Sequence, residues 1–541
     1  MSVVSAPPPR SWPRLALWEW LFLGLFDLGC ALFVMSLGKD MSWDFRNYHW
    51  YIPYAFLHGR MGFDIAVAHQ ATYYNPMIDV PFYWLATHLP AYAAVGIMGA
   101  VQGANIVPLY IIARSLLRLK DNRLPAALLA AFCMTGGMTV SLFGTTYYDN
   151  VMSVFVLTGL AIIIAQHRTL IAGNPWRGAG IALFGGFCVG CAVGLKLPEA
   201  PFALGFAAAI AVLPGERKRR MLRLAGGAIG GVGGTALFEG YWLVRMYEVT
   251  RNPLFPYFNE YFRSPLARDF SFRDTRFLPH GLWHGVLDPI LFSINWRVAD
   301  DLPCSDIRVG LAYVLLLATA VLALVLWLRR RRLSDDTLTE PEPTRALFAF
   351  VTIAYLAWLI VFAIYRYILS LEMLAPIVIV AVVGLWPLRR TWRYGVIAVL
   401  GLAIIATTRA DILPRAPLSD PYVRLRMPPI PHPNHTMILM TGEAPMGYLV
   451  PELPPQIPVI RIDGWLIRPN DGSLLSAEAK ARVTAFKGQL YLIADPAESV
   501  RARRALGDYG LAFSASTCAD IHTNLGGPYM FCPLTRKSPA P

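Results

Sequence analysis

The chain has 541 residues, of which 55% are hydrophobic and only 15% are charged, and its formal net charge is +13. A soluble protein would carry roughly a quarter charged residues, so the composition indicates a polytopic membrane protein. The basic residues fall in short clusters between apolar runs, which is the pattern of cytoplasmic loops and argues against nucleic acid as a partner.

Apolar runs long enough to form transmembrane helices follow one another through residues 1–409. A span needs roughly 17–25 apolar residues, and this criterion predicts an all-α membrane domain of about eleven transmembrane helices. The first run lacks a small-residue cleavage site after it, so we expect it to remain as a span. The predicted spans are 15–37, 91–117, 124–143, 151–166, 179–196, 199–214, 224–244, 309–328, 346–365, 367–387 and 394–409.

Clusters of arginine and lysine assign the loops to the two sides of the membrane. Basic residues follow every even-numbered span, for example in 118–123, 217–223 and 389–393, and loops of this kind are cytoplasmic. We therefore expect a cytoplasmic N-terminus and place the alternate loops outside. The two long outer loops are 38–90 and 245–308, whose aromatic and proline residues are typical of short interfacial helices.

The composition changes near residue 410. Segment 410–435 is rich in proline, which is typical of a linker. Residues 436–541 alternate short apolar runs with helical patterns, and this alternation predicts a small α/β domain on the outer side. Cys518 and Cys532 either pair there or remain two free thiols; the spacing leaves both open.

Five ionisable residues occupy outer-side positions where apolar side chains would cost less to bury, and such residues are candidate functional groups. They are Asp44, Asp149, Lys196, Arg366 and Glu372. Structural roles remain open for several of them. Asp149 suits a helix N-cap, and Lys196 can extend to the membrane interface. Arg366 can pair with Glu372 if the chain bends between them.

The stretch 43–51, with the sequence WDFRNYHWY, directly follows the first span. A carboxylate at this boundary can accept the proton of a hydroxyl, and Lys196 and Arg366 can stabilise a departing phosphate. These residue types favour sugar transfer from a lipid phosphate. The absence of a glycine-rich phosphate loop argues against a nucleotide-sugar donor.

The predicted site therefore has two groups. The catalytic candidates are Asp44 and Asp149, and the substrate-binding candidates are Arg46, Asn47, His49, Tyr74, Asn75, Lys196, Arg366 and Glu372. No cofactor is assigned, although a divalent metal remains possible because carboxylates at 44, 79 and 149 could meet.

This arrangement resembles the GT-C superfamily of membrane glycosyltransferases, of the bacterial type that uses polyprenyl-phosphate sugars. The resemblance rests on Asp44 in the first outer loop and on segment 365–372 (YRYILSLE), which is similar to the Arg-Tyr plus downstream acid pattern of bacterial members. It implies an inverting hexosyl- or pentosyltransferase at the periplasmic face of the inner membrane. The donor would be a polyprenyl-phosphate sugar and the acceptor a lipid, a glycan or a protein.

Two other classes of function remain as alternatives. A lipid or polysaccharide transporter would need charged residues in both halves of its spans, whereas the charges here lie near the outer side. A lipid-linked oligosaccharide ligase or polymerase shares the arginine–phosphate chemistry and differs in transferring a block of sugars.

Overall fold

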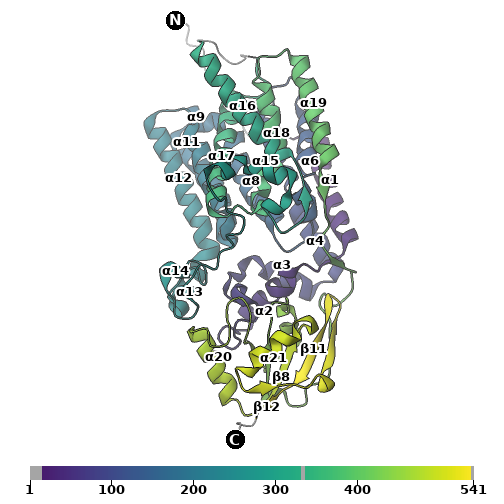
Figure 1. The fold of residues 1–541 in the computed structure, drawn as a ribbon. Helices are drawn as coiled ribbons and strands as arrows, with labels where there is room; N and C mark the ends of the chain where they lie inside the picture. Colours follow the sequence, from purple (N-terminus) through teal and green to yellow (C-terminus); the bar gives the residue numbers. More distant parts are fainter. Residues whose placement is uncertain (1–14, 330–335, 538–541) are drawn as a thin grey trace.

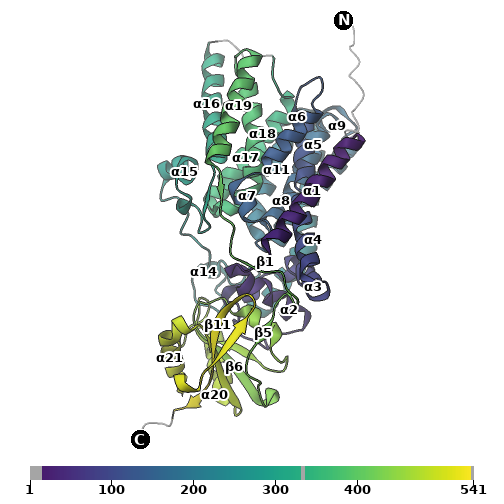
Figure 2. The same cartoon turned by 90° about the vertical axis from the view of Figure 1, so that its right-hand side faces the viewer.

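The computed structural model describes residues 15–329 and 336–537. A helical bundle forms one end of the molecule and a small sheet domain forms the other, with short helices between them (Figure 1). The bundle ends that carry α9 (His167–Ala172) and the start of α19 (Arg390–Thr407) lie far from the sheet (Figure 2). The N-terminal residues 1–14, which we expect in the cytoplasm, lie outside the described part.

Among the described residues, seven helices are long and apolar enough to cross a membrane. They are Leu17–Leu37, Ala91–Leu116, Pro175–Leu195, Arg217–Thr250, Arg308–Leu328, Pro341–Val361 and Tyr365–Gly384. The other four predicted spans fall on α6 (Arg123–Cys133), α8 (Asp149–Ala165), α11 (Ala200–Val212) and α19, which are shorter or less apolar. The predicted span 124–143 is broken after Cys133, so length and composition support seven spans of the eleven predicted.

Helix α18 (Leu369–Gly384) is the centre of the bundle and is buried along almost its whole length. It packs against α6, α8, α16 (Arg308–Leu328) and α17 (Pro341–Val361). A helix that is apolar all round is typical of such a position. Arg366 lies in the 3-10 turn just before α18, so this buried helix fixes the position of the arginine backbone.

Glycines bring α10 (Pro175–Leu195) and α12 (Arg217–Thr235) into direct backbone contact. A Cβ at Gly190 would collide with the carbonyl of Gly231, and a Cβ at Gly230 would collide with that of Leu183. Small residues four apart allow this close approach between membrane helices. The contact holds the C-terminal end of α10, and therefore the following Lys196, in a fixed place.

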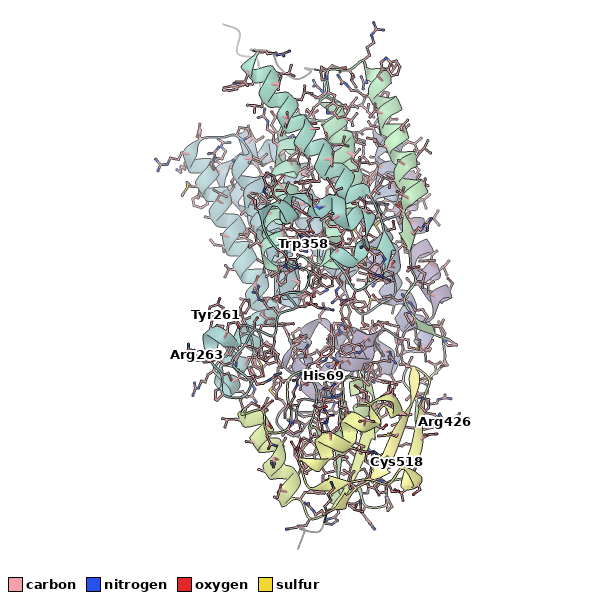
Figure 3. All side chains as sticks on the ribbon, viewed as in Figure 1. His69, Tyr261, Arg263, Trp358, Arg426 and Cys518 are labelled. Atoms are coloured by element: carbon pink, nitrogen blue, oxygen red, sulfur yellow. A yellow bond between two sulfur atoms is a disulfide. The ribbon has the colours of Figure 1, made fainter. Side chains whose placement is uncertain are left out.

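The first outer loop, 38–90, forms short helices rather than an open loop. They are η1 (Phe45–His49), a π-helical turn, then α2 (Tyr51–Leu57), η2 (His69–Tyr73), η3 (Pro76–Ile78) and α3 (Val80–His88). Buried His69 lies between these helices and the sheet domain, where its Nδ1 accepts from the backbone N–H of Trp465 at 3.2 Å (Figure 3).

The C-terminal region contains a mixed six-stranded sheet, in the order β5–β10–β11–β8–β6–β7. Strand β6 runs parallel to β7 and β8, while β11 pairs with β8 and β10 in antiparallel fashion. The strands are β5 (Leu425–Arg426), β6 (Thr436–Met440), β7 (Val459–Arg461), β8 (Gln489–Ala494), β10 (Ala519–Thr523) and β11 (Gly526–Pro533). The helices are α20 (Leu474–Ala485) and α21 (Ser499–Gly507), and the predicted α/β domain is thereby observed.

Both faces of this sheet are covered, which explains why β6 is continuously apolar. Met437 and Leu439 pack with α20 and α21, while Ile438 and Met440 belong to the core shared with the first outer loop and the bundle. Cys518 and Cys532 form a disulfide. The sheet domain therefore sits directly on the first outer loop.

The proline-rich segment 410–435 is held at several points along its length. Strand β3 (Arg409–Ala410) pairs with β2 (Cys304–Ser305), and β4 (Arg415–Ala416) pairs with β1 (Lys39–Asp40). The ammonium of Lys39 donates to the carbonyls of Ser419 and Tyr422 at 3.1 and 2.9 Å. The segment thus forms a strap across both long outer loops and connects the bundle to the sheet domain.

Candidate functional site

Asp44 directly precedes η1, and the π-helical turn brings Tyr48 back to it. The Tyr48 hydroxyl donates to Asp44 Oδ2 at 3.0 Å. The same oxygen lies 3.6 Å from Nη1 of Arg366, and the two side chains are only 15% and 19% exposed. The acid of the first outer loop and the arginine before α18 therefore meet, although 322 residues separate them in the chain.

Arg366 is oriented by an acid and two aromatic rings. Its backbone N–H donates to Asp300 Oδ2 at 2.9 Å, and its guanidinium lies 4.6 Å from the ring centre of Tyr147 and 5.2 Å from that of Tyr367. Burial raises the pKa of the Asp300 carboxyl to about 6. An arginine stacked in this way keeps its planar donors available to an anion.

Lys196 approaches the same rings from the end of α10. Its ammonium donates to the carbonyl of Tyr147 at 2.9 Å, pairs with the Asp149 carboxylate, and lies 5.1 Å from the ring centre of Tyr367. Asp149 begins α8, where a carboxylate also favours the helix dipole. Tyr367 is thus flanked by the two cations, Lys196 and Arg366.

A cavity of about 840 Å³, including its open mouth, lies beside these groups. Its wall is mostly aromatic and apolar, and it contains His49, Asn75, Asp79, Lys196 and Glu239 as polar side chains. Asp44 and Arg366 are not in the wall themselves. However, Tyr48, Tyr147 and Tyr367, which contact them, are in the wall.

Tyr74 and Asn75 belong to this wall. Tyr74 stacks on Tyr257 of the second long outer loop at a ring distance of 5.5 Å, and their hydroxyls are hydrogen-bonded. The Asn75 amide donates to the carbonyls of Gly194 and Phe238 at 3.1 and 2.9 Å. Asn75 therefore anchors the first outer loop to α10 and α12, while Tyr74 closes one side of the cavity.

Arg46 and Asn47 point away from the cavity. The Arg46 guanidinium lies against Gly526 at the β10–β11 turn, and the backbone of Asn47 lies against Gly447. The Asn47 amide donates to the carbonyl of Ala68 at 3.4 Å. Both residues therefore contact parts of the protein that lie outside the cavity wall, and their predicted contact with substrate stays a prediction.

Glu372 also lies apart from the cavity. Its carboxylate accepts from the backbone N–H and the hydroxyl of Thr139 at 2.9 and 2.7 Å, and from the Tyr365 hydroxyl at 2.8 Å. It accepts hydrogen bonds from the free backbone N–H groups at the N-terminus of α7 (Gly137–Ser141), which is a helix-capping role. Arg366 pairs with Asp44 instead of with Glu372.

Within residues 15–329 and 336–537, no group of three or more His, Cys, Asp or Glu side chains is arranged to hold a metal. The three carboxylates that could have met each have a different basic partner. Asp44 faces Arg366, while Asp79 and Asp149 pair with His49 and Lys196, respectively.

Comparison with family models, curated proteins and solved structures finds no match for this chain.

Sequence reasoning did not assign roles to Asp300, Tyr147 and Tyr367. Tyr147 and Tyr367 lie next to or near the residues that were selected, in the stretches 144–150 and 365–372. Their position beside outer-side charges is the signal that would have identified them. Asp300 had no comparable signal, because its partner is the backbone of a residue 66 positions away.

Proposed function

We propose that this protein is an inverting glycosyltransferase that moves a sugar from a polyprenyl-phosphate donor to an acceptor hydroxyl at the outer face of the membrane. The observation that carries the proposal is that Asp44, Lys196 and Arg366 meet beside one cavity: Asp44 faces Arg366, and Lys196 and Arg366 flank Tyr367 of the cavity wall. They come from the first outer loop, the end of α10 and the start of α18. One acid and two cations are the minimum set for activating a hydroxyl and releasing a phosphate.

Each group has a defined task in this reaction. Asp44 accepts the proton of the acceptor hydroxyl as its oxygen attacks the anomeric carbon. The bond between that carbon and the phosphate oxygen breaks on the opposite side, and its electron pair stays with the phosphate. Lys196 and Arg366 stabilise the charge on the departing lipid phosphate, and the aromatic wall faces the apolar side of the sugar.

Several further features support the outer-side location and the lipid donor. The sheet domain contains a disulfide, which forms in oxidising compartments such as the bacterial periplasm. The seven long apolar helices provide a membrane domain next to the cavity. The apolar part of the cavity wall includes Trp242 and Met246 of α13 (Tyr241–Thr250), which lies at the end of one of those helices.

The test uses the full-length protein in lipid nanodiscs with a short-chain prenyl phosphate bearing a radiolabelled sugar, and with membrane extract as the acceptor source. We expect Asp44→Asn to reduce labelled product by about 10²–10⁴-fold, because the amide cannot accept the proton. Asp269→Asn is the matched control, since this exposed aspartate lies in the other long outer loop.

Two outcomes would contradict the proposal. Normal transfer by Asp44→Asn would remove Asp44 from the role of base. Movement of the lipid across the bilayer of proteoliposomes, with no glycosidic product from wild-type protein, would favour the transporter alternative.

A further inference from the structure

A histidine and an aspartate form a buried pair in the wall of the cavity. His49 Nδ1 lies 2.6 Å from Asp79 Oδ1, and both side chains are at least nine-tenths buried. Asp79 belongs to the turn between η3 and α3, so two separate parts of the first outer loop meet here. Burial raises the pKa of the Asp79 carboxyl, and His49 opposes that rise.

The second ring nitrogen of His49 is free. Among the described residues, Nε2 is buried and has no hydrogen-bond partner. Because Nδ1 is occupied by Asp79 and His49 belongs to the cavity wall, Nε2 is the ring nitrogen left for a molecule bound there. A buried polar atom without a partner is unfavourable, and a ligand that bonds to it would remove that cost.

One tyrosine separates this pair from Asp44. The ring of Tyr48 lies 4.0 Å from the imidazole of His49, and its hydroxyl donates to Asp44. The other titratable groups near the pair are Tyr148, whose ring lies 5.2 Å from the imidazole, and the Lys196–Asp149 ion pair in the wall of the same cavity. The His49–Asp79 pair thus lies in the cavity wall, and Tyr48 of the same wall connects it to Asp44.

We propose that His49, oriented by Asp79, transfers a proton from Nε2 to the phosphate oxygen that leaves the sugar. This inference rests on the proposed function. The acceptor oxygen bonds to the anomeric carbon and loses its proton to Asp44, while the bond from that carbon to the phosphate oxygen breaks. The phosphate oxygen keeps the electron pair and receives the His49 proton. Exchange with water later returns a proton to His49 and removes one from Asp44.

The chemistry of the two groups is matched. An imidazole can pass a proton to a phosphate oxygen, because both groups exchange protons near neutral pH. The Asp–His arrangement fixes which nitrogen carries the exchangeable proton, as in other enzymes that use a carboxylate to orient a histidine. Lys196 does not suit this step, because its ammonium is already engaged by Asp149 and the Tyr147 carbonyl.

The first measurement needs no turnover. Full-length protein labelled with ¹⁵N-histidine is titrated with farnesyl phosphate, a short prenyl phosphate, and the His49 signal is assigned by its loss in His49→Gln. We expect farnesyl phosphate to raise the titration midpoint of His49 by about one pH unit, and we expect Asp79→Asn to lower the midpoint in the free protein. His58→Gln, which removes an exposed histidine at the end of α2, should change neither result.

The second measurement is the pH dependence of kcat/KM for sugar transfer. The wild-type rate should fall at alkaline pH as His49 loses its proton, and His49→Gln should lose this alkaline fall together with about 10²–10⁴-fold of the rate. Because His49→Gln leaves the Asp79 carboxylate unpaired, the double variant His49→Gln/Asp79→Asn serves as the folded comparison, verified by its melting temperature.

The outcomes separate this inference from the proposed function. An unchanged alkaline fall in His49→Gln or in the double variant would overturn the inference while sugar transfer stands. If His49→Gln instead lost the fall in rate at acidic pH, His49 would be the base, and this would also overturn the inference. A His49 titration midpoint that does not respond to farnesyl phosphate would overturn it as well. Failure of wild-type protein to transfer any sugar would overturn the proposed function itself.

Discussion

Removing Arg60 should loosen the sheet domain from the first outer loop. The Arg60 guanidinium forms two hydrogen bonds to Asp64, at 2.6 and 2.7 Å, and donates to the carbonyls of Pro455 and Ile457 at 2.6 and 2.8 Å. Asp64 in turn accepts from the backbone N–H of Val459 at 2.9 Å. We choose Arg60→Met because methionine fills most of the space without the charge.

The expected cost follows from the burial of this pair. Arg60 is 5% exposed and Asp64 is fully buried, so Arg60→Met leaves a carboxylate in the interior with no counter-charge. Breaking a buried ion pair in this way costs about 3–5 kcal/mol. The double variant Arg60→Met/Asp64→Asn should recover at least half of the loss, because the neutral amide can still accept from Val459.

The dependence on pH gives a second signature. Burial raises the pKa of the Asp64 carboxyl even in the wild-type protein, where Arg60 opposes the rise. Without Arg60 the folded-state pKa rises further above its unfolded value, so folding takes up a proton and stability falls as pH increases. Arg60→Met should therefore regain thermal stability as the pH is lowered from about 8 to about 5, and the double variant should not.

The assay is hydrogen–deuterium exchange of peptides that cover 60–67 and 455–462, with thermal unfolding in parallel. Exchange should accelerate by about 10²–10⁴-fold in Arg60→Met, because a free-energy loss of about 3–5 kcal/mol raises the open population by that factor. The control is Arg482→Met, because Arg482 also donates to this loop, at the Phe63 carbonyl, but is 35% exposed. Equal acceleration of exchange in Arg60→Met and Arg482→Met would contradict the prediction.

Two further predictions concern the membrane bundle. Gly190→Ala should lower the melting temperature by an amount equivalent to about 1–3 kcal/mol, because its Cβ would collide with the carbonyl of Gly231. The control is Gly180→Ala, on the open side of α10, which should have little effect. Glu372→Gln should cost about 1–3 kcal/mol of stability, with the affinity of the folded protein for farnesyl phosphate unchanged in a binding titration. Weaker binding at equal stability would return Glu372 to the substrate site.

The helical architecture and the C-terminal α/β region were predictable because they follow from patterns within short windows. Apolar length located the long helices of the bundle, and short apolar runs indicated the strands of the C-terminal region. The number of spans was less certain, since the helices at 123–133 and 149–165 are shorter than a typical bilayer requires.

The convergence at the site was predictable only in part. The rule on positive loops placed Asp44, Lys196 and Arg366 on one side of the membrane, and the structure brings them together. The same rule could not distinguish Arg46 and Glu372 from the charged residues beside the cavity. They are also charged and are assigned to the same side of the membrane, but their side chains contact other parts of the protein. The direction in which these two side chains point depends on the turn geometry of η1 and on the start of α18. A charge pattern does not encode either of them.

The proline-rich strap was the least predictable part of the fold. Proline and short polar residues indicated a free linker, yet β3, β4 and β5 each find a strand partner in another region. A strand of two residues has no periodicity that sequence reasoning could detect. Only tertiary pairing defines it.

The strap also has a consequence for biosynthesis. Lys39 and Asp40 lie next to the acid of the site, but the residues that hold them, from Arg415 to Tyr422, leave the ribosome about 380 residues later. The helical turn that carries Asp44 can be locked only after nearly four-fifths of the polypeptide has been made. A nascent or truncated chain that ends before Arg415 would thus lack the strand pairing and the hydrogen bonds that hold Lys39 and Asp40.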